Sequence, residues 1–216
     1  MFVGGVAAYP NRIYFSSIGD PETFGANDWF DIEPGDGDAI TGGIGIKDKV
    51  LFSKSNSWYY LVGSGTNSFS VYPITYSFGA VSYRSIIEYG NDIWCIDCEG
   101  AVRSVLRNQY GLFNGADMSS EFLEKTIETV NKAALNKACA GYKDGYLLFA
   151  IPTGSSTYND LVLVYDGDAP VANGKSKWTT ITGWTPSVFN YFDNELYFAE
   201  ARADGKVYSW SGDTDN

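Results

Sequence analysis

The chain repeats one β-hairpin pattern five times. In each copy, a short entry strand leads through a turn into a strongly apolar second strand. Asparagine and aspartate favour such turns because their short side chains hydrogen-bond to nearby backbone and tolerate left-handed φ values. Five successive antiparallel hairpins are therefore predicted. They cover residues 6–15, 43–52, 85–95, 139–149 and 187–198, with turns at Asn11, Asp48, Asn91, Asp144 and Asp193.

A third strand follows every hairpin, and two copies have a fourth. Equivalent positions in successive copies are 37 to 54 residues apart. A period of about 40 to 50 residues with three or four strands per unit is typical of propeller blades. We therefore predict an all-β fold, a β-propeller of about five blades, as a single domain over residues 1–216. The expected third strands are 29–32, 58–62, 101–105, 161–165 and 206–210, and the expected fourth strands are 69–72 and 178–181.

One segment departs from this pattern. Residues 119–138 are predicted to form an inserted α-helix, with acidic side chains in its first turn and lysines further on, as the helix dipole favours. Apolar residues recur along it at helical spacing. This stripe either packs on a blade edge or contacts another subunit. The candidate contact residues are Phe122, Leu123, Ile127, Val130 and Ala134.

Closure of the propeller is left open by the sequence. The last copy has three visible strands, whereas the chain begins almost inside its first strand. Either residues 1–4 complete the final blade, or the chain is a fragment of a longer subunit.

The charge and composition exclude several classes of partner. The formal net charge of −11, with the basic residues spread along the chain, argues against tight nucleic-acid binding. An acidic surface is compatible with a passage through which DNA slides without sticking. The sequence has no run of about 18 apolar residues, so no membrane span is predicted. Three cysteines do not make a complete disulfide framework, which favours a reducing compartment.

The sequence predicts no catalytic residue, cofactor or metal ligand. It contains no histidine, which excludes a histidine-based triad and a histidine metal site. Cys95 and Cys98 are three residues apart, a spacing that places them on opposite faces of a strand. Residues 34–38 (P-G-D-G-D) resemble the start of a calcium loop, but glycine and aspartate are equally what a tight turn requires.

Two functional alternatives involve sugars. A five-bladed glycosidase would need two carboxylates facing each other across the substrate, and the candidates near strand ends are Asp20, Asp97 and Glu200. A carbohydrate-binding propeller would instead stack exposed tryptophan or tyrosine rings on sugar rings.

Several phrases of the chain resemble a known family. They include R-I-Y-F-S at 12–16, G-D-P-E-T-F at 19–24, P-G-D-G-D-A-I-T-G at 34–42 and K-D-K-V-L-F-S-K at 47–54. The order of these phrases is similar to that of β-propeller virion proteins in the tail hub or nozzle of short-tailed bacteriophages. Later phrases, such as A-G-Y-K-D-G-Y-L-L-F-A-I-P at 140–152, follow the same pattern.

The resemblance implies a non-enzymatic building block of the virion. It implies assembly in the host cytoplasm, partners that are copies of the chain in a ring and other tail proteins, and a place around the channel through which DNA leaves the capsid. The family has no catalytic residues to transfer. Its subunits are usually much longer than this chain.

Overall fold

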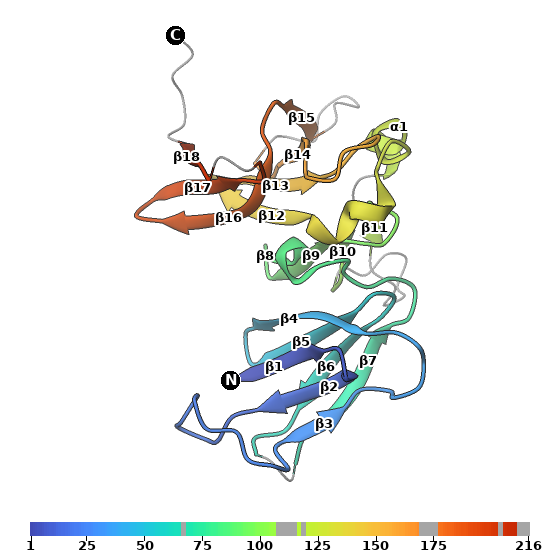
Figure 1. The fold of residues 1–216 in the computed structure, drawn as a ribbon, viewed down its shortest axis with the longest axis vertical. Helices are drawn as coiled ribbons and strands as arrows, with labels where there is room; N and C mark the ends of the chain where they lie inside the picture. The colour runs from blue at the N-terminus through green and yellow to red at the C-terminus, as the bar shows by residue number, and fades with distance from the viewer. Residues whose placement is uncertain (66–67, 107–115, 118–119, 169–176, 203–204, 211–216) are drawn as a thin grey trace.

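A computed structural model gives the fold and describes residues 1–65, 68–106, 116–117, 120–168, 177–202 and 205–210. Over these residues the chain is all-β, and five antiparallel sheets follow one another along the sequence (Figure 1). In every sheet each strand pairs with the next one in the chain. The predicted class and the sheets of three or four strands are therefore confirmed.

The sheets are numbered 1 to 5 in chain order. Sheet 1 contains β1 (Phe2–Val6), β2 (Tyr9–Phe15) and β3 (Trp29–Asp31), and sheet 2 contains β4 (Ile40–Ile46), β5 (Lys49–Lys54), β6 (Trp58–Val62) and β7 (Ser70–Thr75). Sheet 3 contains β8 (Ile87–Tyr89), β9 (Asp92–Ile96), β10 (Val102–Ser104) and β11 (Ala116–Asp117). Sheet 4 contains β12 (Cys139–Lys143), β13 (Tyr146–Ile151), β14 (Leu161–Asp166) and β15 (Trp178–Thr182), and sheet 5 contains β16 (Pro186–Phe192), β17 (Glu195–Glu200) and β18 (Val207–Trp210).

Four of the five predicted hairpin turns are confirmed. Asn91, Asp144 and Asp193 lie between paired strands with φ values of 63°, 49° and 48°, and Asp48 lies in the turn between β4 and β5. Positive φ is tolerated best by glycine, asparagine and aspartate, which explains these residue types.

The prediction for the first hairpin was wrong. Its turn lies between β1 and β2 at residues 7–8, and Asn11 is inside β2. The register of the two strands shifts between Gly4 and Val6, where Gly5 has a φ of 77°. Because β1 pairs with β2, residues 1–4 do not complete the last sheet.

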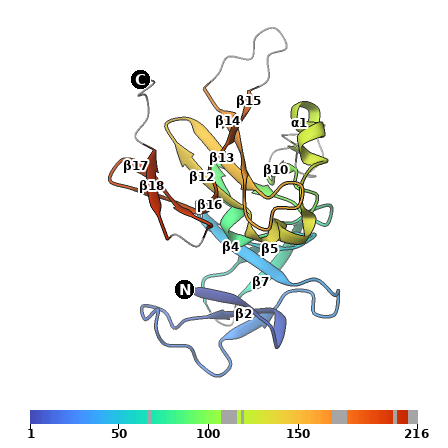
Figure 2. The same cartoon turned by 45° about the horizontal axis from the view of Figure 1, so that its top comes forward.

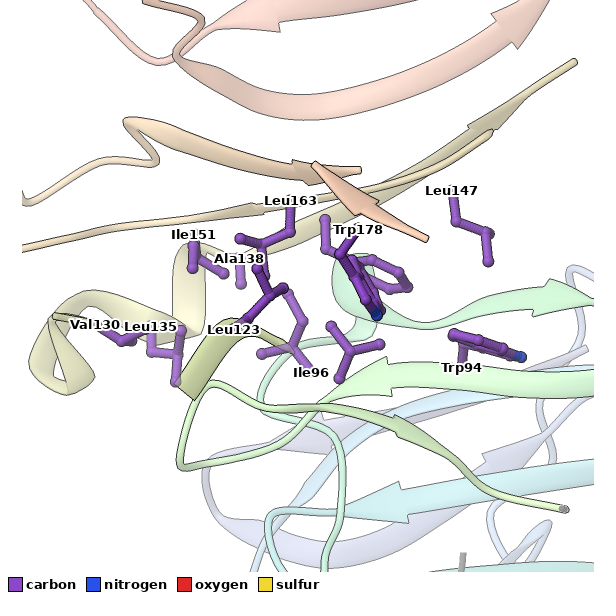
Figure 3. Packing of buried hydrophobic residues seen from close by; sticks show 12 residues of the cluster. Trp94, Ile96, Leu123, Val130, Leu135, Ala138, Leu147, Ile151, Leu163 and Trp178 are labelled. Atoms are coloured by element: carbon purple, nitrogen blue, oxygen red, sulfur yellow. The ribbon is translucent and has the colours of Figure 1, made fainter. Parts of the chain in front are cut away.

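Neighbouring sheets pack on one another through hydrophobic clusters. The described residues form four such clusters, one at each boundary between consecutive sheets, and Figure 3 shows the cluster between sheets 3 and 4. Sheets 2, 3 and 4 are thus covered on both faces, which explains the apolar run of β13. Each cluster has members from both of its sheets: Ile13 and Phe52 for sheets 1 and 2, Leu51 and Ile93 for sheets 2 and 3, Trp94 and Phe149 for sheets 3 and 4, and Leu148 and Phe198 for sheets 4 and 5.

Sheets 1 and 5 end this succession. Their first strands contact only one neighbouring sheet extensively: β1 adjoins β4, and β16 adjoins β12. Figures 1 and 2 show sheet 1 and sheet 5 with the other three sheets between them. Each terminal sheet therefore packs one face and leaves the other uncovered by the described part of the chain.

The helix prediction was only partly right. Instead of one helix over 119–138, there is a short α1 (Ser120–Ile127) followed by a 3₁₀ turn, η2 (Lys132–Lys137). Between them the backbone pairs with residues 152–154: Val130 forms a β-bridge with Thr153, and the Asn131 amide donates to the Pro152 carbonyl. This sheet-like pairing, together with the β-branched residues of T-I-E-T-V at 126–130, ends the helix early.

Candidate functional site

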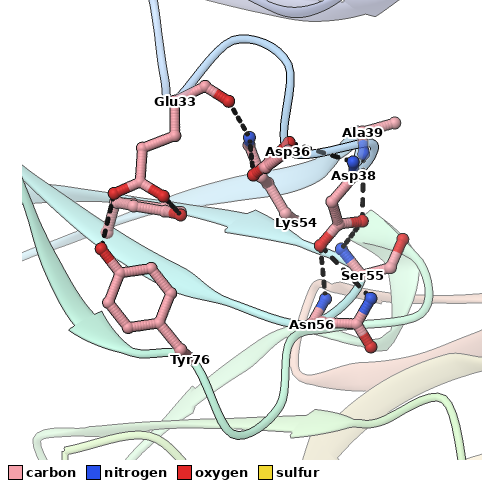
Figure 4. A network of polar contacts seen from close by, with 9 residues as sticks. Glu33, Asp36, Asp38, Ala39, Lys54, Ser55, Asn56 and Tyr76 are labelled. Carbon is pink, nitrogen blue, oxygen red and sulfur yellow. Dashed lines mark hydrogen bonds and ion pairs between the residues drawn. The ribbon is translucent and has the colours of Figure 1, made fainter.

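Asp36 and Asp38 of the 34–38 loop form an ion pair and hydrogen bonds with residues 54–56. The fully buried Lys54 side chain places its Nζ 2.6 Å from Asp36 Oδ2 and also donates to the Glu33 carbonyl at 3.2 Å (Figure 4). Asp38 accepts hydrogen bonds from the backbone amides of Ser55 at 3.1 Å and Asn56 at 2.8 Å. The loop is therefore fastened to the turn between β5 and β6, and the turn alternative of the sequence analysis is favoured over a calcium loop.

Glu33 completes this network from a strained backbone position. Its φ is 41°, in the left-handed region that a side chain rarely adopts. Its carboxylate accepts hydrogen bonds from the Tyr76 hydroxyl at 2.5 Å and the Tyr59 hydroxyl at 2.9 Å. Burial, with this carboxylate beside the hydroxyl, raises the pKa of Tyr59 to about 12. The described residues contain no group of three or more cysteine, aspartate and glutamate side chains suited to a metal ion.

The three acids considered for a glycosidase lie in different sheets. Asp97, which is 2% exposed, accepts from the amides of Glu99 and Ala101 and from Arg103 Nε at 2.6 Å. Asp20 accepts from the backbone and hydroxyl of its own loop after β2, and Glu200 at the end of β17 accepts from Thr185. Each carboxylate thus has local structural partners.

The two cysteines of the C-x-x-C phrase have different environments. Cys95 is buried in the core between sheets 2 and 3, and burial raises the pKa of its thiol far above the ordinary range. Cys98 is exposed in the following turn. Their separation agrees with the prediction that they do not share a site.

An aromatic cavity lies between sheets 3 and 4. It has a volume of about 460 Å³, and its walls include Tyr89, Trp94, Tyr165, Asp92 and Lys177. The Trp94 ring centroid lies 6.0 Å from that of Tyr89 and 5.1 Å from that of Tyr165. Aromatic faces next to charged groups are what a sugar ring requires. Sequence analysis missed this cavity because its residues come from separate copies of the repeat.

The predicted subunit-contact residues are mostly inside the chain. Leu123 and Val130 are buried in the cluster between sheets 3 and 4, and Ile127 packs against the same cluster. Ala134 is also buried, whereas the side chain of Phe122 lies outside the described residues. The structure favours the alternative in which the stripe packs on a sheet edge. A contact between subunits at this segment stays a prediction.

The uncovered face of sheet 5 is apolar. Phe192 and Val207 on this face are 69% and 65% exposed. Together with Val188, Tyr197 and Ala199, they line a shallow hollow of about 330 Å³. Single exposed apolar residues are common, but a contiguous group marks a contact site. Alternate residues of a strand lie on opposite faces of the sheet, but the sequence does not show which of the two faces another sheet covers. The exposed apolar face could therefore not be predicted from the sequence alone.

The uncovered face of sheet 1 carries an ordered arginine and aromatic group. Val3, Tyr14 and Trp29 lie side by side across the three strands, and Arg12 pairs with Asp31 in the same sheet. The Arg12 guanidinium lies 3.3 Å from the centroid of the Trp29 ring and donates two hydrogen bonds to Asp31, at 2.8 and 3.0 Å. These contacts hold the Trp29 ring in place at the surface.

Comparison with known proteins assigns no family. Neither a family model nor a curated protein matches this chain. Among the described helices, none combines the length and apolarity that crossing a membrane requires. The functional conclusion therefore depends on the geometry of the sheets and their two uncovered faces.

Proposed function

We propose that the chain is a non-enzymatic structural subunit of a phage virion, of the propeller type that forms tail hubs and nozzles. The observation that carries the proposal is the pair of uncovered faces at the two ends of the sheet succession. Propeller blades normally pack both faces, as sheets 2, 3 and 4 do. The uncovered apolar surface of sheet 5 is suited to contact with another protein.

In this proposal the five sheets are propeller blades. Three features support that assignment. Each sheet is a meander of consecutive strands, and each boundary has a hydrophobic cluster between two sheets. The first strands also adjoin at three of the four boundaries: β1 with β4, β8 with β12, and β12 with β16. Copies of the subunit form part of a ring around the DNA exit channel and contact other tail proteins. The virion is then its final location, after assembly in the host cytoplasm.

The charge of the chain suits such a channel. A net charge of −11 repels a phosphate backbone, so DNA passes without being retained. Replacing exposed acids by lysine in the channel wall is expected to hinder DNA release while the isolated domain stays folded. Unchanged DNA release in all such variants would contradict the channel role.

The first test is the mass of the purified chain by light scattering, followed by negative-stain images. A closed ring with a central hole is the expected result at high concentration. A chain that remains a monomer at every concentration, alone and with other tail proteins, would overturn the proposal.

The aromatic cavity between sheets 3 and 4 favours one alternative, a carbohydrate-binding propeller. A sugar stacked on Tyr165 would quench the fluorescence of the adjacent Trp94 and bind with millimolar or better affinity. Replacing Tyr165 by alanine would remove this binding. A glycan screen without quenching by any sugar would exclude the alternative.

A further inference from the structure

We propose that the uncovered face of sheet 5 in one copy binds the uncovered face of sheet 1 in a second copy, with Trp29 seated in the hollow above Ala199. This contact rests on the proposed ring-forming function and identifies the surface through which the copies meet. It is distinct from the segment 119–138 that the sequence indicated.

The sheet 5 side offers a hollow with apolar walls. Ala199 pairs with Val188 on one side and Val207 on the other, so its small side chain leaves a depression between two larger ones. Phe192 and Tyr197 extend the apolar surface around it. Contacts at such hollows are strongest when an aromatic side chain fills them and excludes water.

The sheet 1 side supplies an aromatic anchor that is already ordered. Trp29 is 37% exposed and is held from one side by Arg12, which is itself fixed by Asp31. Tryptophan, tyrosine and arginine are the residue types that dominate binding energy at protein interfaces. Because the Trp29 ring is held before binding, little conformational entropy is lost when it enters the hollow.

Shape favours pairing these two faces over pairing either face with itself. The charges on both faces already have partners, because Arg12 is paired with Asp31 and Glu195 accepts from the buried Lys143 at 3.2 Å. Sheet 1 offers an exposed aromatic ring and sheet 5 offers a hollow, so only the pairing of unlike faces fills the hollow.

The contact would repeat a boundary that the chain already uses four times. Consecutive sheets within one copy pack face to face, and sheet 5 followed by the next copy's sheet 1 continues that order. Three strands spaced about 4.8 Å apart and about six residues long cover roughly 300 Å² in projection, well below the about 800 Å² per partner of a standard protein interface, so one such contact is weak by itself. Binding two different faces is heterologous, so it generates a ring or an open filament.

Cysteine trapping tests the pairing directly. In a Cys98→Ser background, Val3→Cys and Val207→Cys are made separately, and the two proteins are mixed under mild oxidation; Val3 is 41% exposed on the same face as Trp29, so the anchor itself stays intact. A disulfide-linked dimer is expected in the mixture and in neither protein alone. The matched control is Ile18→Cys, which is 85% exposed in the loop after β2 and should not link to Val207→Cys. Dimers of Val207→Cys alone would show a sheet 5 to sheet 5 contact and overturn the proposal.

A charged substitution separates this proposal from the proposed function. Val207→Arg at a largely exposed site should leave folding intact but weaken self-association at least tenfold, measured by sedimentation equilibrium. Ile18→Arg is the control and should associate like the unmodified chain. Rings that form equally well with Val207→Arg would overturn this contact while leaving the structural role intact. An unmodified chain that never associates would overturn both.

Discussion

Asp36→Asn is expected to destabilise the fold by about 2 kcal/mol. Removing one partner of a buried ion pair costs about 3 to 5 kcal/mol because the other charge stays buried without compensation. Lys54 is fully buried, so its charge would be left in that situation. The cost is lower here because the Asp36 side chain is 30% exposed and the Glu33 carbonyl still accepts from Lys54.

Urea unfolding followed by tryptophan fluorescence measures this cost. With a dependence of about 2 kcal/mol per molar urea, the midpoint of Asp36→Asn should fall by about 1 M. The matched control is the double variant Asp36→Asn with Lys54→Met, which removes the buried charge as well and should recover much of the loss. An unchanged midpoint for Asp36→Asn would refute the reasoning. A lower urea midpoint of the unmodified chain after calcium chelation would also refute it, because that result would mean that residues 34–38 bind calcium.

The same ion pair has a defined pH dependence. Burial alone would raise the pKa of Asp36, but the hydrogen bonds from Lys54 and from the Asp38 amide outweigh it and leave the pKa below its ordinary value. The stabilisation is therefore complete above the unfolded-state pKa of about 4 and is lost as the pH falls through the lower folded-state pKa. Asp36→Asn should remove this part of the acid sensitivity of the unfolding midpoint.

Three further outcomes are expected. Leu135→Ala, in the cluster between sheets 3 and 4, should cost about 3 kcal/mol in the same urea assay, and a loss below 1 kcal/mol would contradict the packing of η2. Asp97→Asn should lower stability by about 2 kcal/mol because Asp97 orders its turn and pairs with Arg103; normal stability would reopen a catalytic role. At pH 8 an aromatic disulfide reagent should label Cys98 alone in the folded chain, because Cys98 is exposed whereas Cys95 and Cys139 are buried, and burial raises the pKa of Cys139 to about 12. Labelling of all three thiols before unfolding would refute the burial of Cys95 and Cys139.

Local sequence predicted the strands well because hairpins depend on nearby residues. Alternating or continuous apolar runs select strands, and the asparagine or aspartate at Asn91, Asp144 and Asp193 supplies the positive φ that each turn requires. The first hairpin was misplaced because its turn lies at residues 7–8, where two alanines stand in place of the asparagine or aspartate of the other turns. The sequence has no turn signal at that point, whereas Asn11 inside β2 resembles one.

The helical segment shows the limit of local pattern. Its apolar spacing predicted a stripe that either packs on a blade edge or contacts another subunit, and Leu123 and Val130 lie in one cluster inside the chain, which favours the first alternative. It did not predict the interruption, because the competing hydrogen bonds come from residues 152–154, which are more than 20 positions away. Long-range backbone pairing overrides local helix propensity there.

The sequence by itself determined the all-β class, the number of repeated units and most strand boundaries, because these depend on periodicity and turn chemistry over a few residues. Only the tertiary structure decided which carboxylates form ion pairs or hydrogen bonds within the protein, as Asp36 does with Lys54. It also decided which sheet faces remain uncovered. Both depend on contacts between residues far apart in the chain. Val207 is exposed and Phe198 is buried on adjacent strands of sheet 5 because sheet 4 covers only one of its faces.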